Sequence, residues 1–260
     1  MMPLNLGQHI SQKFSEELEE VRRKVLQMGG IIEEQLERAI RALLDGDQEL
    51  AREVVANDAA INALEVEIDE ECIRIVALRQ PAATDLRLVM AVIRTINDLE
   101  RIGDEIKRVA KMVREDDAGG LDEEVRLEVE HMGAQVREML HRVLDAFART
   151  DVESAVNVAM ADRKVDAKYV SITRQLMTYL AQDYQNIPAV LNVMWAARAL
   201  ERMGDRCQNI AEYVIYLVLG KDVRHSSLDE VMADLEKRAA SDAAAPGRPP
   251  PGPRAAGSGG

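Results

Sequence analysis

Oxygen-bearing side chains stand four residues apart at four places in the sequence, and all but one of them are carboxylates. The four pairs are Asp58 and Asn62, Glu100 and Asp104, Asp162 and Asp166, and Glu201 and Asp205. A spacing of four puts both members of a pair on one face of a helix, one turn apart. The pairs lie along or beside apolar positions, where carboxylates repel one another unless they are protonated, paired with cations or bound to metal. Such oxygen-rich groups suit magnesium, manganese, iron or calcium-like ions.

Two of these pairs belong to a segment that occurs twice. Leu99–Asp104 reads Leu-Glu-Arg-Ile-Gly-Asp, and Leu200–Asp205 repeats it 101 residues later with Met in place of Ile. Upstream, a colinear series of matches, including Asp47 with Asp151, has an offset of 104. One change of three residues accounts for the difference, so the pattern indicates a tandem duplication. The glycine in each segment costs helix propensity, which predicts a close approach by a neighbouring backbone or an ion-bearing side chain.

Long helices are expected to position these groups. Outside its first four residues and its tail the chain has only two prolines, Pro81 and Pro188, and the long stretches between them have a 3.6-residue apolar period. The expected helices span about 8–44, 47–78, 82–115, 122–149, 151–183 and 188–219. Asp47 and Asp151 are predicted N-caps, and Gly220 is a predicted C-terminal glycine. Hydrophobic residues make up 47% of the chain and aromatic residues only 3%, so the core must be aliphatic.

These elements predict an all-α protein of two tandem, duplicated three-helix bundles, each running up, down and up. The expected divisions are a first bundle at 5–115, a linker at 116–121, a second bundle at 122–220, a C-terminal extension at 221–240 and a tail at 241–260. A capping box at Ser227–Glu230 predicts a short helix in the extension. The tail is rich in Pro, Gly and Ala and is expected to be disordered.

The positions of the acidic pairs predict that they face one another. Residues at equal height in an antiparallel hairpin are centred on its turn. In the first unit the acidic pairs on the second and third helices are centred on Pro81, and in the second unit they are centred between Asp183 and Tyr184. Both centres fall in predicted loops. Each unit is therefore expected to bring four oxygen-bearing side chains together.

Charge and composition exclude several classes of function. The net charge of −13 argues against nonspecific nucleic-acid binding, which needs clustered Lys and Arg. The two cysteines, Cys72 and Cys207, lie in predicted helices and are expected to be small core residues in a reducing compartment. We see no secretory signal and no run of eighteen apolar residues, so we expect a cytoplasmic protein without membrane insertion. Trp195 is interpreted as a packing residue.

Salt bridging is the first alternative to metal binding. In that interpretation Arg101, Arg202 or Arg206 neutralises the acidic groups, and the protein is a purely structural bundle. Chelation of metals would then leave its stability unchanged.

A carboxylate-bridged metal enzyme is the second alternative. Ferritin-like sites use Glu-x-x-His pairs from two facing helices. The sequence has such pairs at Glu128–His131 and Glu138–His141, but both fall on one predicted helix. Nucleotide hydrolysis lacks support, because the sequence has no G-x-x-x-x-G-K-[ST] loop.

Longer segments resemble the PhoU family of phosphate-uptake regulators. The resemblance runs from about residue 4 to 235, and five segments carry it: Arg79–Met90, Asn97–Asp104, Arg174–Tyr179, Glu201–Ala211 and Lys221–His225. It implies a pair of three-helix bundles that forms a cytoplasmic regulator without catalytic turnover, expected as a homodimer. It also implies that the protein links the ATPase subunit of the phosphate ABC transporter to the phosphate sensor histidine kinase. Such a protein restrains uptake and is a negative regulator of the phosphate regulon.

The resemblance further implies multinuclear metal clusters, of iron, zinc, manganese or magnesium ions. Carried over by position, the ligands are Asp58, Glu100 and Asp104 in the first unit and Asp162, Asp166, Glu201 and Asp205 in the second. Asn62 departs from the acidic pattern, because its amide oxygen can coordinate a metal but adds no negative charge. We therefore expect the first unit to bind metal more weakly.

Overall fold

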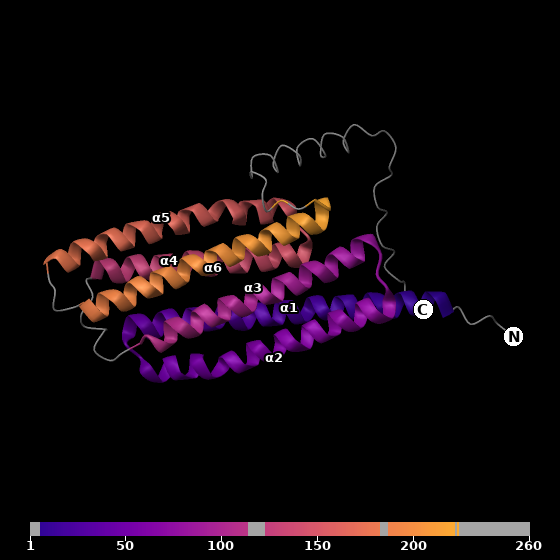
Figure 1. The fold of residues 1–260 in the computed structure, drawn as a ribbon, viewed down its shortest axis with the longest axis horizontal. Coiled ribbons are helices and arrows are strands. Elements are labelled where there is room, and N and C mark those ends of the chain that lie inside the picture. The colour runs from indigo at the N-terminus through magenta and orange to yellow at the C-terminus, as the bar shows by residue number, and fades with distance from the viewer. Residues whose placement is uncertain (1–5, 114–122, 183–186, 222, 224–260) are drawn as a thin grey trace, which may run out of the picture. The chain divides into compact units, whose positions relative to one another are not determined.

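The computed structural model describes residues 6–113, 123–182, 187–221 and 223, and this part of the chain is built from six α-helices and their turns (Figure 1). The helices are α1 (Leu6–Asp45), α2 (Gln48–Arg79), α3 (Ala83–Lys111), α4 (Glu123–Arg149), α5 (Val152–Gln182) and α6 (Ile187–Leu219). The prediction of an all-α protein with six long helices is confirmed. The predicted linker, the short helix expected after Ser227 and the tail lie outside the described residues.

Local side-chain chemistry determines where several helices begin and end. Asp47 caps α2 as predicted, because its carboxylate accepts hydrogen bonds from the amides of Glu49 and Leu50, both at 3.0 Å. Asp151 caps α5 in the same way, accepting from an amide of the first turn at 3.1 Å. Gly220 ends α6 with φ at +68° and donates its amide back to the last turn at 2.8 Å.

Two helix boundaries differ from the predicted ones. Helix α3 ends at Lys111 rather than near residue 115, in a tight turn where the Met112 amide donates to the Val109 carbonyl at 3.1 Å. The residues at 115–117 are all acidic, and negative charge is unfavourable at the C-terminal end of a helix. Helix α6 begins one residue before Pro188, which still lies in the first turn, where its missing amide costs no hydrogen bond.

Aliphatic side chains fill the core of each bundle, as the composition predicted. Fully buried side chains include Met28, Ile32 and Leu36 on α1, Ile61 and Ile68 on α2, and Val89, Ile96 and Ile102 on α3. The second bundle has Met132 and Leu140 on α4, Val165 and Ile172 on α5, and Val190 and Met203 on α6. Each such side chain contributes about 1.5–3 kcal/mol relative to an exposed one. The same packing holds α2 against α3 and α5 against α6, as the acidic pairs require.

The two bundles contact each other mainly through two helix pairs, α1 with α4 and α3 with α6 (Figure 1). Glycines allow the first pair to approach closely. A β-carbon on Gly29 would clash with Leu144, and one on Gly133 would clash with Ile40. None of the described helices is both long and apolar enough to span a membrane.

Candidate metal centres

The second bundle brings three of the predicted carboxylates together. Asp162 and Asp166 on α5 and Asp205 on α6 each offer an oxygen, and these oxygens lie within 4.8 Å of one another. Glu201 is the fourth predicted ligand, and it is not part of this group. One of its oxygens pairs with Arg198, and the other is buried without a hydrogen-bond partner.

Electrostatics make the second cluster unfavourable without a cation. Asp162 is only 5% exposed, and its Oδ1 has no hydrogen-bond partner. Burial, reinforced by Asp166, Asp205 and Glu201, raises the pKa of Asp162 from 3.8 to about 7. Burial and Asp166 also raise the pKa of Asp205, and burial and Asp205 raise that of Glu201 despite Arg198. Protonation or a bound cation would relieve this repulsion.

Gly204 makes room for the buried carboxylate. A β-carbon at Gly204 would lie 2.8 Å from Asp162 Oδ1 and 3.3 Å from a methyl group of Val165. The glycine therefore lets an acidic side chain of α5 lie against the α6 backbone. This agrees with the prediction that the glycine allows a close approach. The matched glycine, Gly103, instead faces Ile61, 3.2 Å from the position of its β-carbon.

The first bundle places an ammonium group on its buried carboxylate. Asp58 is 6% exposed, and Lys107 Nζ lies 2.5 Å from its Oδ2. The Asn62 amide lies 3.4 Å from the same oxygen and donates to it. Burial, with Asp104 next, raises the pKa of Glu100. Among the described residues, the close three-carboxylate arrangement occurs in the second bundle and not in the first.

Lys107 was missed at the sequence level, although comparison of the two repeats contains a signal for it. Matched positions differ by 104 residues before the Pro81 turn and by 101 after it. The residue matched to Lys107 is Gln208. Lys107 lies one helical turn after Asp104, so it shares the face that carries the acidic pair. A lysine in only one copy of a repeated acidic site is therefore a visible difference in charge.

Acidic residues of α2 extend the first cluster beyond the predicted pairs. Burial, then Asp69 and Asp104, raise the pKa of Glu65. Glu65 and Asp69 help to line a cavity of about 400 Å³ between α2 and α3. In the second repeat the residue matched to Glu65 is Tyr169, and the guanidinium of Arg198 lies 5.6 Å from the centroid of its ring. The two acidic sites therefore differ at two matched positions: Lys107 corresponds to Gln208, and Glu65 corresponds to Tyr169.

Two of the three arginines that could have neutralised the clusters form their ion pairs elsewhere. Arg202 pairs with Glu105 at 3.2 Å, and Arg206 pairs with Asp98 at 3.4 Å. Both pairs connect α6 to α3, across the contact between the bundles. The salt-bridge alternative therefore predicted the wrong ion-pair partners for Arg202 and Arg206.

The Glu-x-x-His pairs of the enzyme alternative do not join the acidic clusters. Glu128 binds Lys168 at 2.7 Å, and Glu138 binds Arg142 at 2.6 Å. His141 lies 3.4 Å from a carboxylate oxygen of Glu33. Both glutamates therefore form ion pairs within the second bundle and do not face a shared metal site.

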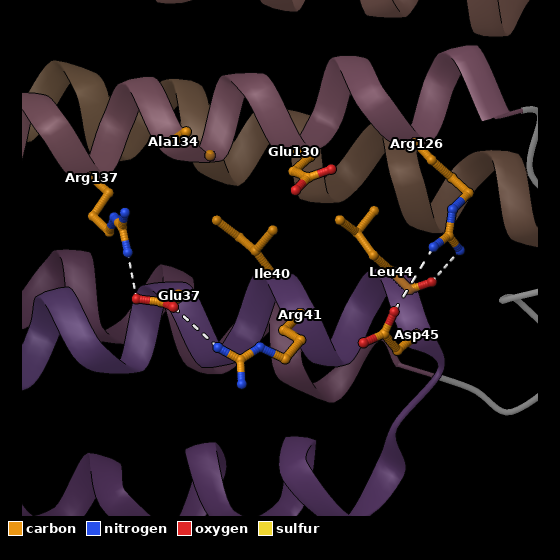
Figure 2. A pocket seen from close by; sticks show the side chains of 10 residues that line it. Glu37, Ile40, Arg41, Leu44, Asp45, Arg126, Glu130, Ala134 and Arg137 are labelled. Carbon is orange, nitrogen blue, oxygen red and sulfur yellow. Dashed lines mark hydrogen bonds and ion pairs between the residues drawn. The ribbon is translucent and has the colours of Figure 1, made fainter.

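A pocket of about 510 Å³ lies between α1 and α4, where the two bundles meet (Figure 2). Its arginines each face an acceptor. Arg137 and Arg41 both pair with Glu37, and Arg126 lies 3.8 Å from Asp45 and donates to a backbone carbonyl. Because these charges are balanced, the pocket offers no free cationic site for an anion.

Exposed apolar side chains recur at matched positions on α2/α3 and α5/α6. The matched pairs are Val66 and Val170, Ile73 and Met177, Leu86 and Ile187, and Met90 and Leu191, all at least 38% exposed. We call these eight residues the repeated apolar face. Trp195 lies on the same helix as Leu191 and is 58% exposed. Its interpretation as a packing residue is wrong, because the core stripe of α6 passes through Val193, Ala196 and Ala197 and turns position 195 outward.

A family model and the sequences of known proteins indicate the same family for this chain. The PhoU domain family matches residues 25–113 and 129–214, one match in each bundle. A phosphate-specific transport system accessory protein from Serratia marcescens is 48% identical over 88% of this chain and 94% of its own length. The corresponding protein of Escherichia coli K12 is 47% identical over 89% of this chain and 95% of its own length.

Solved structures agree with these sequence matches. The crystal structure of PhoU from Pseudomonas aeruginosa is 48% identical, with a TM-score of 0.76 over 80% of this chain and 100% of that one. The phosphate transport system regulatory protein PhoU from Streptococcus pneumoniae is 31% identical, with a TM-score of 0.73 over 81% of this chain and 99% of that one. The chain therefore belongs to the PhoU family.

Proposed function

We propose that the protein is a non-catalytic accessory protein of phosphate transport that acts as a cytoplasmic adaptor. It couples the ATPase subunit of a phosphate ABC transporter to a phosphate sensor histidine kinase, restrains uptake and represses the phosphate regulon when phosphate is plentiful. The names of its relatives support the transport role. The ion pairs of Glu128 and Glu138 argue against the di-iron enzyme alternative.

The repeated apolar face is the observation that carries the adaptor proposal. Single exposed apolar residues are common on protein surfaces, but these positions are apolar in both copies even where the residue type differs, as at Ile73 and Met177. The acidic clusters lie on the same two helix pairs as this face. A partner would therefore fit if it offered apolar groups bordered by Lys or Arg. Two copies of the face suit a partner with two equivalent surfaces, as a dimer has.

A complementation experiment tests the adaptor proposal. Deleting the gene should derepress alkaline phosphatase in high phosphate, and the wild-type gene should restore repression. Ile73→Lys combined with Met177→Lys changes two side chains that are more than half exposed, so the variant should fold but fail to restore repression. Leu127→Lys is the control, because Leu127 is also exposed but its matched residue is Arg23.

Two results would contradict the adaptor proposal. Unchanged alkaline phosphatase in the deletion strain would exclude the regulatory role. Full repression by the double variant would exclude the apolar face as the docking surface. Pull-downs of the purified protein with the transporter ATPase and with the kinase, with and without a chelator, would then identify which partner contact depends on metal. Light scattering tests the expected homodimer.

We also propose that the second bundle binds a metal ion through Asp162, Asp166 and Asp205, with Glu201 beside them. The clustered oxygens, the unpartnered Oδ1 of buried Asp162 and the raised pKa of that residue support this site. A bound metal would neutralise the carboxylates and link α5 to α6. Metal analysis of the purified protein should show loss of metal in Asp205→Ala and little loss in Asp104→Ala. Equal loss from both variants, or no metal in the wild type, would contradict this proposal.

A further inference from the structure

Lys107 and Gln208 occupy the same place in the two repeats, but only Lys107 carries a charge. Both side chains are half-buried. Lys107 Nζ contacts Asp58 Oδ2 at 2.5 Å, and Asp58 is matched to Asp162. The ammonium group therefore lies on the carboxylate that corresponds to the most buried acid of the second cluster.

The charge at the four predicted ligand positions differs between the two bundles, apart from Glu65 and Asp69 beside the first set. The predicted ligands carry three carboxylates in the first bundle, where Asn62 replaces an acid, and four in the second. The ammonium group of Lys107 lowers the negative charge at the first set of positions further. The second cluster has a cation too, but Arg198 pairs with Glu201 and not with Asp162. Asp162 is 95% buried, and its Oδ1 has no hydrogen-bond partner. Asp58 Oδ1 also lacks one, but Lys107 lies on the other oxygen of Asp58, and no described cation forms an ion pair with Asp162.

We propose that Lys107 is a built-in counter-cation that takes the place of a metal ion in the first bundle, while the second bundle depends on an exchangeable metal. This inference rests on the proposed metal site of the second bundle. Asn62 lowers the attraction for a metal, but Lys107 occupies the position beside the buried carboxylate and excludes a metal directly.

Exchange of the two matched residues tests the inference. Lys107→Gln gives the first bundle the residue of the second, and Gln208→Lys does the reverse. Lys111→Gln is the control, because it removes a charge from the last residue of the same helix. Mn²⁺ binding to each full-length, chelator-stripped protein is followed by calorimetric titration, and thermal midpoints are measured with and without EDTA.

The expected results differ between the variants. Lys107→Gln should show a Mn²⁺ site in the first bundle whose affinity is roughly tenfold to a hundredfold higher than that of the same position in the wild type, and Lys111→Gln should not. Gln208→Lys should weaken the wild-type site by a similar factor and make the thermal midpoint insensitive to EDTA. If Lys107→Gln fails to fold, the titration of Gln208→Lys decides the question, since retention of full Mn²⁺ affinity overturns the inference.

Failure of the inference and failure of the metal proposal give separate results. Wild-type protein that binds Mn²⁺ through Asp205, combined with a Lys107→Gln variant that gains no site, overturns the role of Lys107 alone. Absence of Mn²⁺ binding in the wild type overturns the second-bundle site and the inference with it.

Discussion

Asp162 on α5 lies directly against Gly204 on α6, so that a β-carbon on the glycine would stand 2.8 Å from Asp162 Oδ1. We expect Gly204→Ala to displace this carboxylate and weaken metal binding by roughly tenfold or more, although alanine improves helix propensity by up to about 1 kcal/mol. Gly103→Ala is the matched control. Its β-carbon would meet a methyl group of Ile61 at 3.2 Å, which a small side-chain movement relieves. Equal Mn²⁺ affinities of the two variants in a titration would contradict this account.

The buried Asp98 is expected to be a major link between the two bundles. Its carboxylate accepts a hydrogen bond from the Tyr213 hydroxyl at 2.8 Å and contacts Arg206 and Asn209 at 3.4 and 3.3 Å. Tyr213→Phe should cost about 1–2 kcal/mol in urea unfolding, and Asp98→Ala should cost about 3 kcal/mol because it leaves several donors without their acceptor.

An exposed ion pair provides the control for that measurement. Asp145 binds Arg149 one turn away at 2.8 Å, with both side chains largely exposed. Asp145→Ala should cost no more than about 0.5 kcal/mol. A cost for Asp98→Ala as small as this would show that the network does not hold the bundles together.

The metal-free protein should lose stability as the pH rises from 5 to 8. The pKa of Asp162 is raised from 3.8 to about 7 by burial and neighbouring carboxylates. The folded state therefore retains a proton that the unfolded state has already lost in this range. The favourable contribution is complete below pH 4 and is lost as the pH passes 7, with a magnitude of up to about 4 kcal/mol.

The pH effect is isolated by comparing variants in EDTA. Asp162→Asn keeps the shape of the side chain but cannot ionise, so its unfolding free energy should fall less between pH 5 and pH 8 than that of the wild type. Parallel curves for the two proteins would show that Asp162 ionises normally in the fold.

Both cysteines should be unreactive in the native protein. Cys72 and Cys207 are fully buried. Burial, then the charges of Asp69 and Glu71, raise the pKa of Cys72 to about 12, and burial, then Asp162 and Asp98, raise that of Cys207. Since the thiolate is the reactive form, we expect modification by a thiol reagent at pH 8 to be slow until guanidinium unfolds the chain. Rapid labelling of the native protein would contradict this burial.

Much of the fold could be predicted from the sequence, because the patterns that indicate it are local to one helix or repeated in the two units. Helical periodicity predicted the six helices, and the side chain of Asp47 identified the start of α2. Centring the acidic pairs on their turns predicted four clustered side chains in each unit, and the structure brings together three of them, Asp162, Asp166 and Asp205, in the second unit. These features depend on contacts within one helix or between neighbours in one hairpin.

The remaining features depend on packing that periodicity does not specify. Arg202 and Arg206 turned toward α3 because the bundles pair through α3 and α6, a contact that no local pattern indicates. Glu201 forms an ion pair with Arg198, which lies one turn earlier on the same helix. Lys107 could have been noticed by comparing the repeats, but its contact with Asp58 required the side-chain geometry of α2 and α3.

The most direct test of the central claim is an anomalous difference map from crystals soaked in Mn²⁺. We expect a peak among Asp162, Asp166 and Asp205 and none beside Asp58, where Lys107 lies. A peak of equal height at Asp58, or a second bundle without any peak, would contradict it.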